Sequence, residues 1–140
     1  MIKILIVDDH PLFRSTLKTI IENQDGMTVV AEAQNGIEAL KQVKRHQPDV
    51  ILMDVSMPEM DGIDATRQIR AEFSGIKIIA LTSYAEEFYK EKMMEAGAND
   101  YLSKICSRGD LIECILSVWS EDSATGDESG DKDGADTNRP

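Results

Sequence analysis

Residues 51–62 read ILMDVSMPEMDG, and this stretch decides the fold. Three apolar residues lead directly into an acid, Asp54, and the loop that follows contains a proline and ends in Asp-Gly. A continuous apolar run is typical of a strand in a parallel sheet, because helices cover both faces of such a sheet. A strand of this kind that ends in a carboxylate places a charged group at the sheet edge where parallel α/β folds carry their sites.

Short runs rich in β-branched residues recur along the chain, at 3–7, 27–33, 49–53, 77–81 and 100–102. Between them, apolar residues recur every three or four positions, as in Phe13, Leu17 and Ile21. This is the spacing of a helix that buries one face. The alternation predicts an α/β fold of the (βα)5 type, a doubly wound parallel sheet with right-handed crossovers.

Proline and glycine positions agree with these helices. Pro11 suits the first turn of a helix, and Gly97 suits a glycine cap at a helix C-terminus. Residues 85–96 are the least apolar helix candidate. The last helix is expected to bury Leu111, Ile112, Ile115, Leu116 and Trp119.

Length and charge limit the function classes. A chain of 140 residues suits one domain, and its net charge of −11 argues against a nucleic-acid surface. There is no apolar run long enough to span a membrane and no signal peptide, so we expect a cytoplasmic protein. After Trp119 apolar residues nearly disappear. We therefore expect a domain over 1–119 and a disordered acidic tail or linker over 120–140.

The polar residues that follow the predicted strands form the candidate site. Asp8 and Asp9 follow the first strand, Asp54 ends the third, Thr82 ends the fourth and Lys104 follows the fifth. If the strand order is 2-1-3-4-5, these groups converge on one pocket. Close carboxylates repel one another unless a cation joins them, and an all-oxygen cluster favours Mg²⁺ or Mn²⁺. Asp54 could then act as a nucleophile toward a phosphoryl group.

Each of these residues also has a plain structural interpretation when it is taken alone. We favour a helix-capping or turn role for Asp61, and for His10 we favour helix capping or simple exposure. A lone Thr82 is most often a strand-end residue, and a lone Lys104 is most often a solvated charge. The functional interpretation rests on the complete set at one edge.

The motifs identify a family. The stretches ILIVDDHPLFR (4–14), DVILMDVSMPEMDGIDATRQIR (49–70), IIALTSY (78–84) and AGANDYLSK (96–104) resemble the receiver domain of two-component response regulators. The NarL/FixJ-like branch looks most similar, and the resemblance covers residues 1–119. It implies a flavodoxin-like sheet in the order 2-1-3-4-5. One position departs from the common pattern, since Ile105 stands where many receivers have proline.

The resemblance also implies a role for each site residue. Asp54 would become the 4-aspartylphosphate, and Thr82 and Lys104 would hold the phosphoryl group. Asp9 and Asp54 would bind Mg²⁺ directly, Asp8 through water, and Ser56 through its backbone carbonyl. Tyr101 would be an aromatic switch.

The expected function is a receiver that a sensor histidine kinase or a phosphotransfer protein phosphorylates in a Mg²⁺-dependent reaction. The phosphoryl group would change the surface of the fourth helix, fifth strand and fifth helix, with homodimerisation on phosphorylation as one outcome. We expect a phosphoacceptor that assists its own phosphorylation, not a multiple-turnover enzyme. The resemblance implies regulation of transcription by a longer parent protein, since NarL-like regulators usually continue into a helix-turn-helix. Residues after Trp119 have no apolar periodicity from which to build one.

Two alternatives remain. The chain could be a stand-alone receiver that signals through partner proteins, or a pseudo-receiver used only as an interaction module, and the intact acid set argues against the pseudo-receiver. A phosphatase with an Asp nucleophile needs an acid two residues further on, where this sequence has Ser56.

Overall fold

The computed structural model describes residues 1–83 and 88–128, and for residues 121–128 it describes the backbone alone. The described elements follow one another as β1 (Ile2–Val7), α1 (Pro11–Glu22), β2 (Met27–Ala33), α2 (Gly36–His46), β3 (Val50–Asp54), α3 (Gly62–Glu72), β4 (Lys77–Thr82), α4 (Lys90–Ala96), β5 (Asp100–Ser103) and α5 (Arg108–Glu128). The strands form one parallel sheet in the order β2-β1-β3-β4-β5. Both the predicted (βα)5 fold and the predicted strand order are confirmed.

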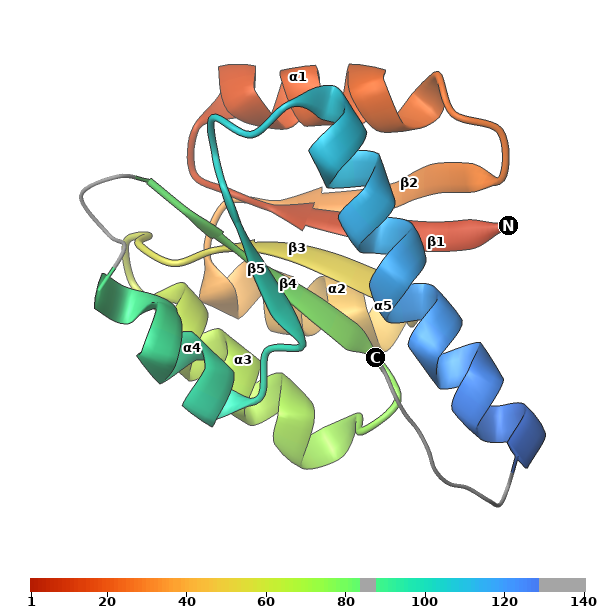
Figure 1. Ribbon diagram of the computed structural model, residues 1–140. Coiled ribbons are helices and arrows are strands. Elements are labelled where there is room, and N and C mark those ends of the chain that lie inside the picture. Colours follow the sequence, from red (N-terminus) through yellow and green to blue (C-terminus); the bar gives the residue numbers. More distant parts are fainter. Residues whose placement is uncertain (84–87, 129–140) are drawn as a thin grey trace.

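The sheet separates two apolar cores, because successive side chains of a strand point to opposite faces. Leu5 and Val7 of β1 face α2, α3 and α4, whereas Ile4 and Ile6 face α1 and α5. Figure 1 shows this arrangement, with α1 and α5 on one side of the sheet and the other three helices beneath it. The central strands are buried on both faces, which accounts for the continuous apolar run that precedes Asp54.

Helix ends are set by the residues that the sequence singled out. The Asp61 side chain caps α3 by accepting a hydrogen bond from a backbone N–H, the role expected of this acid. Asn35 caps α2 in the same way. Gly97 ends α4 with a φ of 120°, a conformation that favours glycine.

The buried face of α5 differs from the prediction. Leu111, Cys114, Ile115 and Val118 are buried, whereas Leu116 and Trp119 are 45% and 40% exposed. Apolar residues cover a wide arc of this helix, so spacing alone did not decide which side meets the sheet. Leu111 and Ile115 of the predicted face are buried as expected, whereas Cys114 and Val118 pack against the sheet in place of Leu116 and Trp119.

The helix α5 also extends further than expected. Its backbone is helical to Glu128, whereas no helix was expected after Trp119; the domain boundary at residue 119 stays a prediction. Adding residues to an anchored helix costs little, because each new residue gains a hydrogen bond without a new nucleation step. Residues 129–140 lie outside the described part of the chain, as do residues 85–87 of the predicted fourth helix.

Arg70, near the end of α3, joins the loops at the edge of the sheet where β4 and β5 begin. Its guanidinium donates to the carbonyls of Phe73, Ser74 and Ile76 at 2.7–3.1 Å. It also donates to the Gly97 carbonyl at 2.9 and 3.1 Å and to Asn99 Oδ1 at 2.8 Å. Burial lowers the pKa of Arg70. The α3–β4 and α4–β5 connections are therefore held by one side chain.

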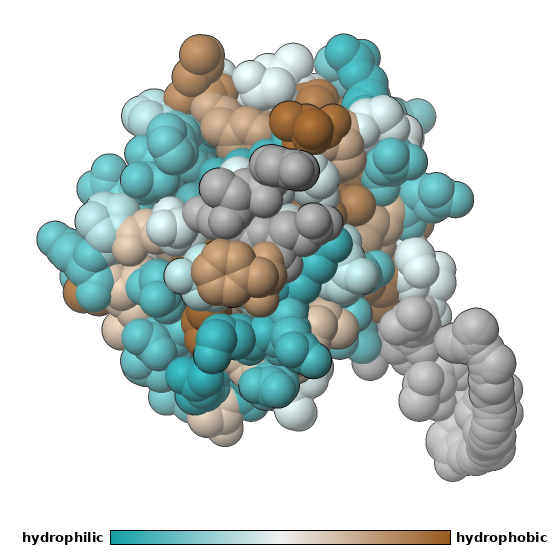
Figure 2. All heavy atoms as spheres, turned by 60° about the vertical axis from the view of Figure 1, so that its left-hand side comes forward, coloured by the Kyte–Doolittle hydropathy of each residue, from teal (hydrophilic) through white to brown (hydrophobic). Residues whose placement is uncertain are grey.

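The opposite edge, where the strands end, carries a mixed surface. Figure 2 turns this edge toward the viewer and shows hydrophobic side chains at several places among hydrophilic ones. Leu12, Phe88 and Ile105 are exposed by 81%, 70% and 89%. Over the described residues, no helix has both the length and the apolar character that a membrane span requires.

Candidate functional site

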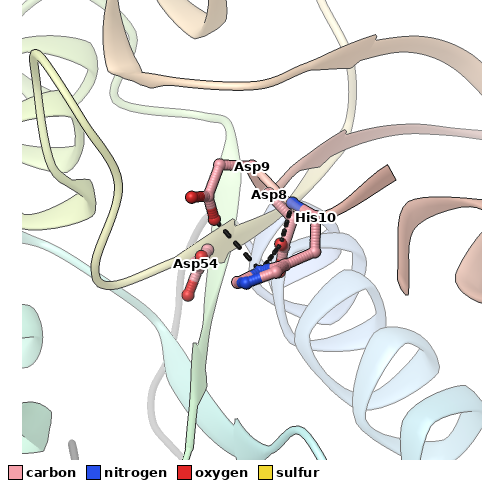
Figure 3. Close-up of side chains that lie close together, drawn as sticks. All are labelled: Asp8, Asp9, His10 and Asp54. Atoms are coloured by element: carbon pink, nitrogen blue, oxygen red, sulfur yellow. Dashed lines mark hydrogen bonds and ion pairs between the residues drawn. The ribbon is translucent and has the colours of Figure 1, made fainter. Parts of the chain in front are cut away.

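Three carboxylates meet where β1 and β3 end. Val7 pairs with Met53 in the parallel register, so the next residues, Asp8 and Asp54, lie side by side. Asp8 is fully buried and Asp54 is 1% exposed, whereas the Asp9 side chain is 30% exposed. Figure 3 shows these side chains converging on one point together with His10. One ligand atom from each of the four residues lies within 4.8 Å of the others.

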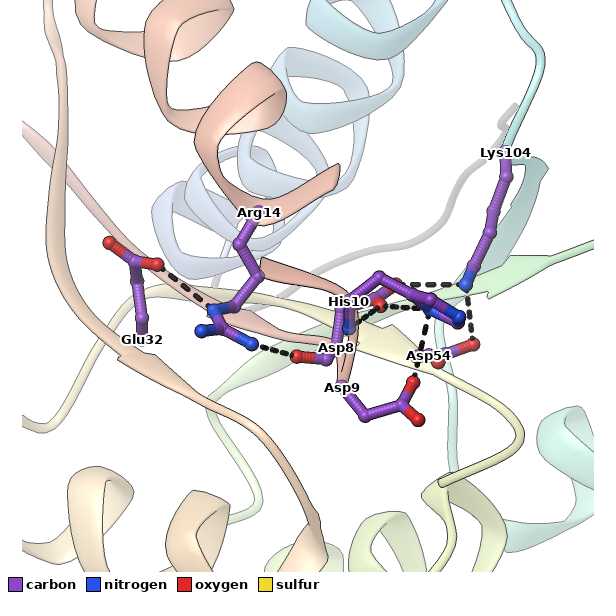
Figure 4. A network of polar contacts seen from close by, with 7 residues as sticks. All are labelled: Asp8, Asp9, His10, Arg14, Glu32, Asp54 and Lys104. Carbon is purple, nitrogen blue, oxygen red and sulfur yellow. Dashed lines mark hydrogen bonds and ion pairs between the residues drawn. The ribbon is translucent and has the colours of Figure 1, made fainter. Parts of the chain in front are cut away.

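Lys104 reaches this cluster from the end of β5. Its Nζ lies 2.8 Å from Asp8 Oδ2 and 3.0 Å from Asp54 Oδ1 (Figure 4). Burial by itself lowers the pKa of the ammonium, but hydrogen bonds and charge attraction from the two carboxylates outweigh it, so the pKa of Lys104 is raised. The lysine therefore carries a full charge that balances part of the acidic cluster.

Thr82 ends β4 at the same edge and is 2% exposed. Its hydroxyl donates a long hydrogen bond of 3.4 Å to the Leu102 carbonyl of β5. The Thr82 carbonyl accepts from the Lys104 N–H at 2.9 Å, so the backbone positions the hydroxyl and the lysine relative to each other. A hydroxyl held by one long bond can turn to a better acceptor at little cost.

The loop after Asp54 is set by close packing at Gly62. A Cβ at Gly62 would lie 2.0 Å from the Asp54 carbonyl oxygen, so a larger residue would push these two segments apart. The Gly62 N–H donates to the Val55 carbonyl at 2.8 Å. This contact brings α3 against the end of β3 and shapes the turn that contains the exposed Ser56. Whether the Ser56 carbonyl is a metal ligand stays a prediction.

Tyr101 lies at the surface beside the site and is 39% exposed. The Lys90 ammonium, at the start of α4, sits 4.4 Å from the centre of its ring. This is the geometry of a cation–π contact, which stabilises the outward position of the ring. The role of Tyr101 as a switch stays a prediction.

Two residues of the site were not found from the sequence. His10 is the N-cap residue of α1, but its side chain makes no capping hydrogen bond; the ring turns toward Asp8 and Asp9 instead. Arg14 donates to the Asp8 carbonyl at 2.5 Å and to Glu32 Oε1 at 3.1 Å (Figure 4). It holds the β1–α1 turn against β2. The only sequence feature that could have indicated Arg14 is a basic residue that follows the two acids, Asp8 and Asp9, within one short stretch.

The oxygen atoms at this site are suitable ligands for a hard divalent cation. Asp9 Oδ1 is buried and receives no hydrogen bond from the part of the chain that the structure describes. Buried carboxylate oxygens without donors are costly unless a cation joins them. Carboxylate and carbonyl oxygens are the ligands that Mg²⁺ and Mn²⁺ prefer.

Comparisons with known proteins agree with this geometry. The model of the response regulator receiver domain matches residues 4–116. The response regulator UvrY of Escherichia coli is 42% identical over 120 residues, which cover 86% of this chain and 55% of UvrY. The chain therefore spans about half the length of the curated relatives it matches.

Solved structures show the same likeness. The receiver domain of NarL from Mycobacterium tuberculosis superposes with a TM-score of 0.80 at 28% identity and covers 85% of this chain and 96% of that one. The receiver domain of the sensor histidine kinase PA1611 from Pseudomonas aeruginosa, solved with magnesium in its active-site cleft, has a TM-score of 0.75 at 35% identity, with 84% and 97% covered. The described fold, the acidic edge and these matches confirm the resemblance, and the chain belongs to the family of response regulator receiver domains.

Proposed function

We propose that Asp54 accepts a phosphoryl group from a sensor histidine kinase or a phosphotransfer protein. The observation that carries this proposal is a buried carboxylate at the end of β3, next to Asp8 and 3.0 Å from the Lys104 ammonium. A carboxylate oxygen of Asp54 forms the new O–P bond as the P–N bond of the donor's phosphohistidine breaks. The bonding electron pair stays on the donor's imidazole nitrogen.

The proposal includes Mg²⁺, for which Mn²⁺ can substitute. Asp9 and Asp54 would hold the ion directly, Asp8 through water and Ser56 through its carbonyl. When bound, the ion offsets the negative charge that opposes attack of one anion on another. The magnesium in the PA1611 receiver supports this assignment by likeness.

Lys104 and Thr82 would receive the phosphoryl group. Lys104 now contacts both Asp8 and Asp54, and it would exchange its Asp54 contact for a phosphoryl oxygen. The Thr82 hydroxyl would leave the Leu102 carbonyl, to which its bond is long, and donate to another phosphoryl oxygen. For Thr82 this replaces a long neutral hydrogen bond with a charge-assisted one, and for Lys104 it exchanges one charge-assisted contact for another.

These movements would reach the surface formed by α4, β5 and α5. Thr82 and Tyr101 lie on neighbouring strands, and Lys104 follows Tyr101 by three residues. Movement of the Thr82 hydroxyl would allow the Tyr101 ring to settle inward. Substitution Thr82→Ala should leave phosphorylation of Asp54 intact while the Tyr101 ring no longer responds, as NMR of the beryllofluoride form would show. A ring that moves equally in wild type and Thr82→Ala contradicts this coupling.

Acetyl phosphate with Mg²⁺ provides the direct test of the phosphoacceptor. Wild-type protein should gain the mass of one phosphoryl group, and the product should be cleaved by hydroxylamine. Substitution Asp54→Asn should abolish the gain, while Asp61→Asn, which changes an acid that only caps α3, should retain it. Undiminished labelling of Asp54→Asn would overturn the assignment.

The partner and the output complete the proposal. Leu12 and Ile105 flank the site and are exposed by 81% and 89%, so they offer apolar contacts to a docking kinase.

We propose a phosphoacceptor that is not itself a multiple-turnover enzyme. The 120 matched residues cover 55% of UvrY, and regulation of transcription would belong to a longer parent protein. Homodimerisation on phosphorylation and a cytoplasmic location stay predictions.

A further inference from the structure

The His10 ring is largely exposed, but one of its nitrogens lies close to two carboxylates of the acidic cluster. Its side chain is 68% exposed, yet its Nδ1 is 3.0 Å from Asp8 Oδ1 and 3.1 Å from Asp9 Oδ1 (Figure 3). The contact with Asp8 is a hydrogen bond. The contact with Asp9 is not, because Asp9 Oδ1 receives no hydrogen bond from the described residues. The ring nitrogen and this oxygen lie at the distance of an ion pair, which is charged only when the imidazole is protonated.

The backbone directs the ring to this place. The His10 N–H donates to Asp8 Oδ1 at 2.8 Å, which folds the β1–α1 turn back over the carboxylates. The side chain makes no cap on α1, and Pro11 follows as the first helical residue. The turn therefore positions the ring, and the ring does not cap the helix.

The distances also match those between two ligands of one metal ion. Adjacent ligands of an octahedral ion with bonds of about 2.1 Å lie about 3 Å apart. His10 Nδ1 and Asp9 Oδ1 have this separation, at 3.1 Å. In this structure Nδ1 carries the hydrogen of its bond to Asp8 Oδ1, since a carboxylate only accepts. In the other tautomer, with the hydrogen on Nε2, the Nδ1 lone pair would face the same ion that Asp9 binds.

We propose that His10 is a nitrogen ligand of the metal site and gives this receiver affinity for borderline divalent ions such as Zn²⁺ and Co²⁺. The inference rests on the metal site of the proposed function. Imidazole nitrogen suits Zn²⁺ and Co²⁺, whereas Mg²⁺ prefers oxygen ligands. Carboxylates alone bind Zn²⁺ and Co²⁺ in addition to Mg²⁺. The effect that distinguishes His10 is therefore a change in the ratio of the Zn²⁺ and Mg²⁺ affinities.

The test compares Zn²⁺ and Mg²⁺ binding by calorimetry, on the full chain without a polyhistidine tag. Substitution His10→Gln should weaken Zn²⁺ binding about tenfold or more, the size expected when ligation is disturbed. Mg²⁺ binding should change less than about threefold, because the amide keeps an oxygen for a hard ion. His46→Gln, which changes the other histidine, at the end of α2, is the matched control and should alter neither affinity. Cys106→Ser excludes binding of Zn²⁺ by this partly exposed thiol.

A second measurement identifies the ligand directly. With Co²⁺, the ring protons of His10 should show large paramagnetic NMR shifts, and those of His46 should not. Equal losses of Zn²⁺ and Mg²⁺ affinity in His10→Gln would show a role in positioning Asp8 or Asp9 and would overturn the inference, as would no loss at all.

The outcome is separable from that of the proposed function. Labelling of wild-type Asp54 by acetyl phosphate and Mg²⁺ tests only the proposed function. If labelling succeeds while His10→Gln binds Zn²⁺ as wild type does, only the inference on His10 fails. If wild type is not labelled, the proposed function fails whatever His10 binds.

Discussion

Lys104 and Arg70 are partly buried cations at opposite edges of one sheet, and their partners differ in kind. Arg70 donates to carbonyl and amide oxygens, which are neutral, and burial lowers its pKa. Lys104 contacts two carboxylates, which raise its pKa despite burial. The neutral acceptors of Arg70 do not change charge when a metal or a phosphoryl group binds at the opposite edge, whereas the carboxylates beside Lys104 lose negative charge when they bind either one. One cation is therefore a fixed clamp, and the other is built to exchange partners.

This comparison predicts the largest loss of stability at Arg70. Substitution Arg70→Met leaves several carbonyls without a donor, and we expect a loss of about 3 kcal/mol in the free energy of unfolding. The melting temperature should fall on the order of 10 °C in circular dichroism, with Mg²⁺ or without it. Arg67→Met is the control, since Arg67 on the same helix is 61% exposed and makes one surface pair with Asp64. A similar fall in both variants would end the description of Arg70 as a clamp.

Lys104 should behave differently in one respect. Substitution Lys104→Met leaves Asp8 and Asp54 to repel each other, and we expect a loss of about 2 kcal/mol in EDTA. Saturating Mg²⁺ should restore most of this loss, because a cation again joins the carboxylates. The measurement is thermal unfolding with EDTA and with Mg²⁺, and Lys41→Met, an exposed residue of α2, is the control. If Mg²⁺ restores Arg70→Met as well as it restores Lys104→Met, the distinction between the two cations is lost.

A smaller effect is expected at the Lys90–Tyr101 contact. An exposed cation–π pair contributes about 0.5–1 kcal/mol, so Lys90→Met should raise the inward population of the Tyr101 ring about two- to fivefold before phosphorylation. NMR of labelled tyrosine measures this population. Lys92→Met changes an exposed lysine of the same helix and should leave the ring unaffected. An unchanged ring in Lys90→Met would mean that the cation does not hold it outward.

The smallest effect is expected from the C-terminal segment. Residues 121–140 contain two alanines as their only apolar residues, so they have little surface to bury, and their deletion should change the free energy of unfolding by less than about 0.5 kcal/mol. Labelling of Asp54 should also persist. A clear fall in melting temperature would show that this segment packs against the domain that holds Arg70 and Lys104 and stabilises it.

The sequence contained most of the fold because its signals were redundant. β-branched runs, helical spacing and terminal residues such as Pro11, Asp61 and Gly97 all indicated the same (βα)5 order. The buried face of α5 was misjudged because apolar residues lie on several sides of that helix, and only contact with the sheet chooses among them. The extension of α5 to Glu128 was missed because composition describes what a segment can bury, not whether a preceding helix continues through it.

The candidate site could be assembled from strand ends alone. Parallel strands bring their last residues to one edge, so Asp8, Asp54 and Lys104 could be placed together before any distance was known. The ring direction of His10 could not, because it depends on the hydrogen bond that folds the turn back onto Asp8. Arg70 was also missed, since its partners are main-chain carbonyls, which no sequence pattern displays.

The clamp at Arg70 has a consequence for protein engineering. It ties together the α3–β4 and α4–β5 loops, so a reporter domain inserted in either would disrupt the shared hydrogen bonds. The turn between α1 and β2 lies outside this network, and Gly26 there has open space around it. A fluorescent protein inserted between Gln24 and Asp25 should therefore be tolerated, and it would mark the receiver in living cells while leaving the opposite edge open to its kinase.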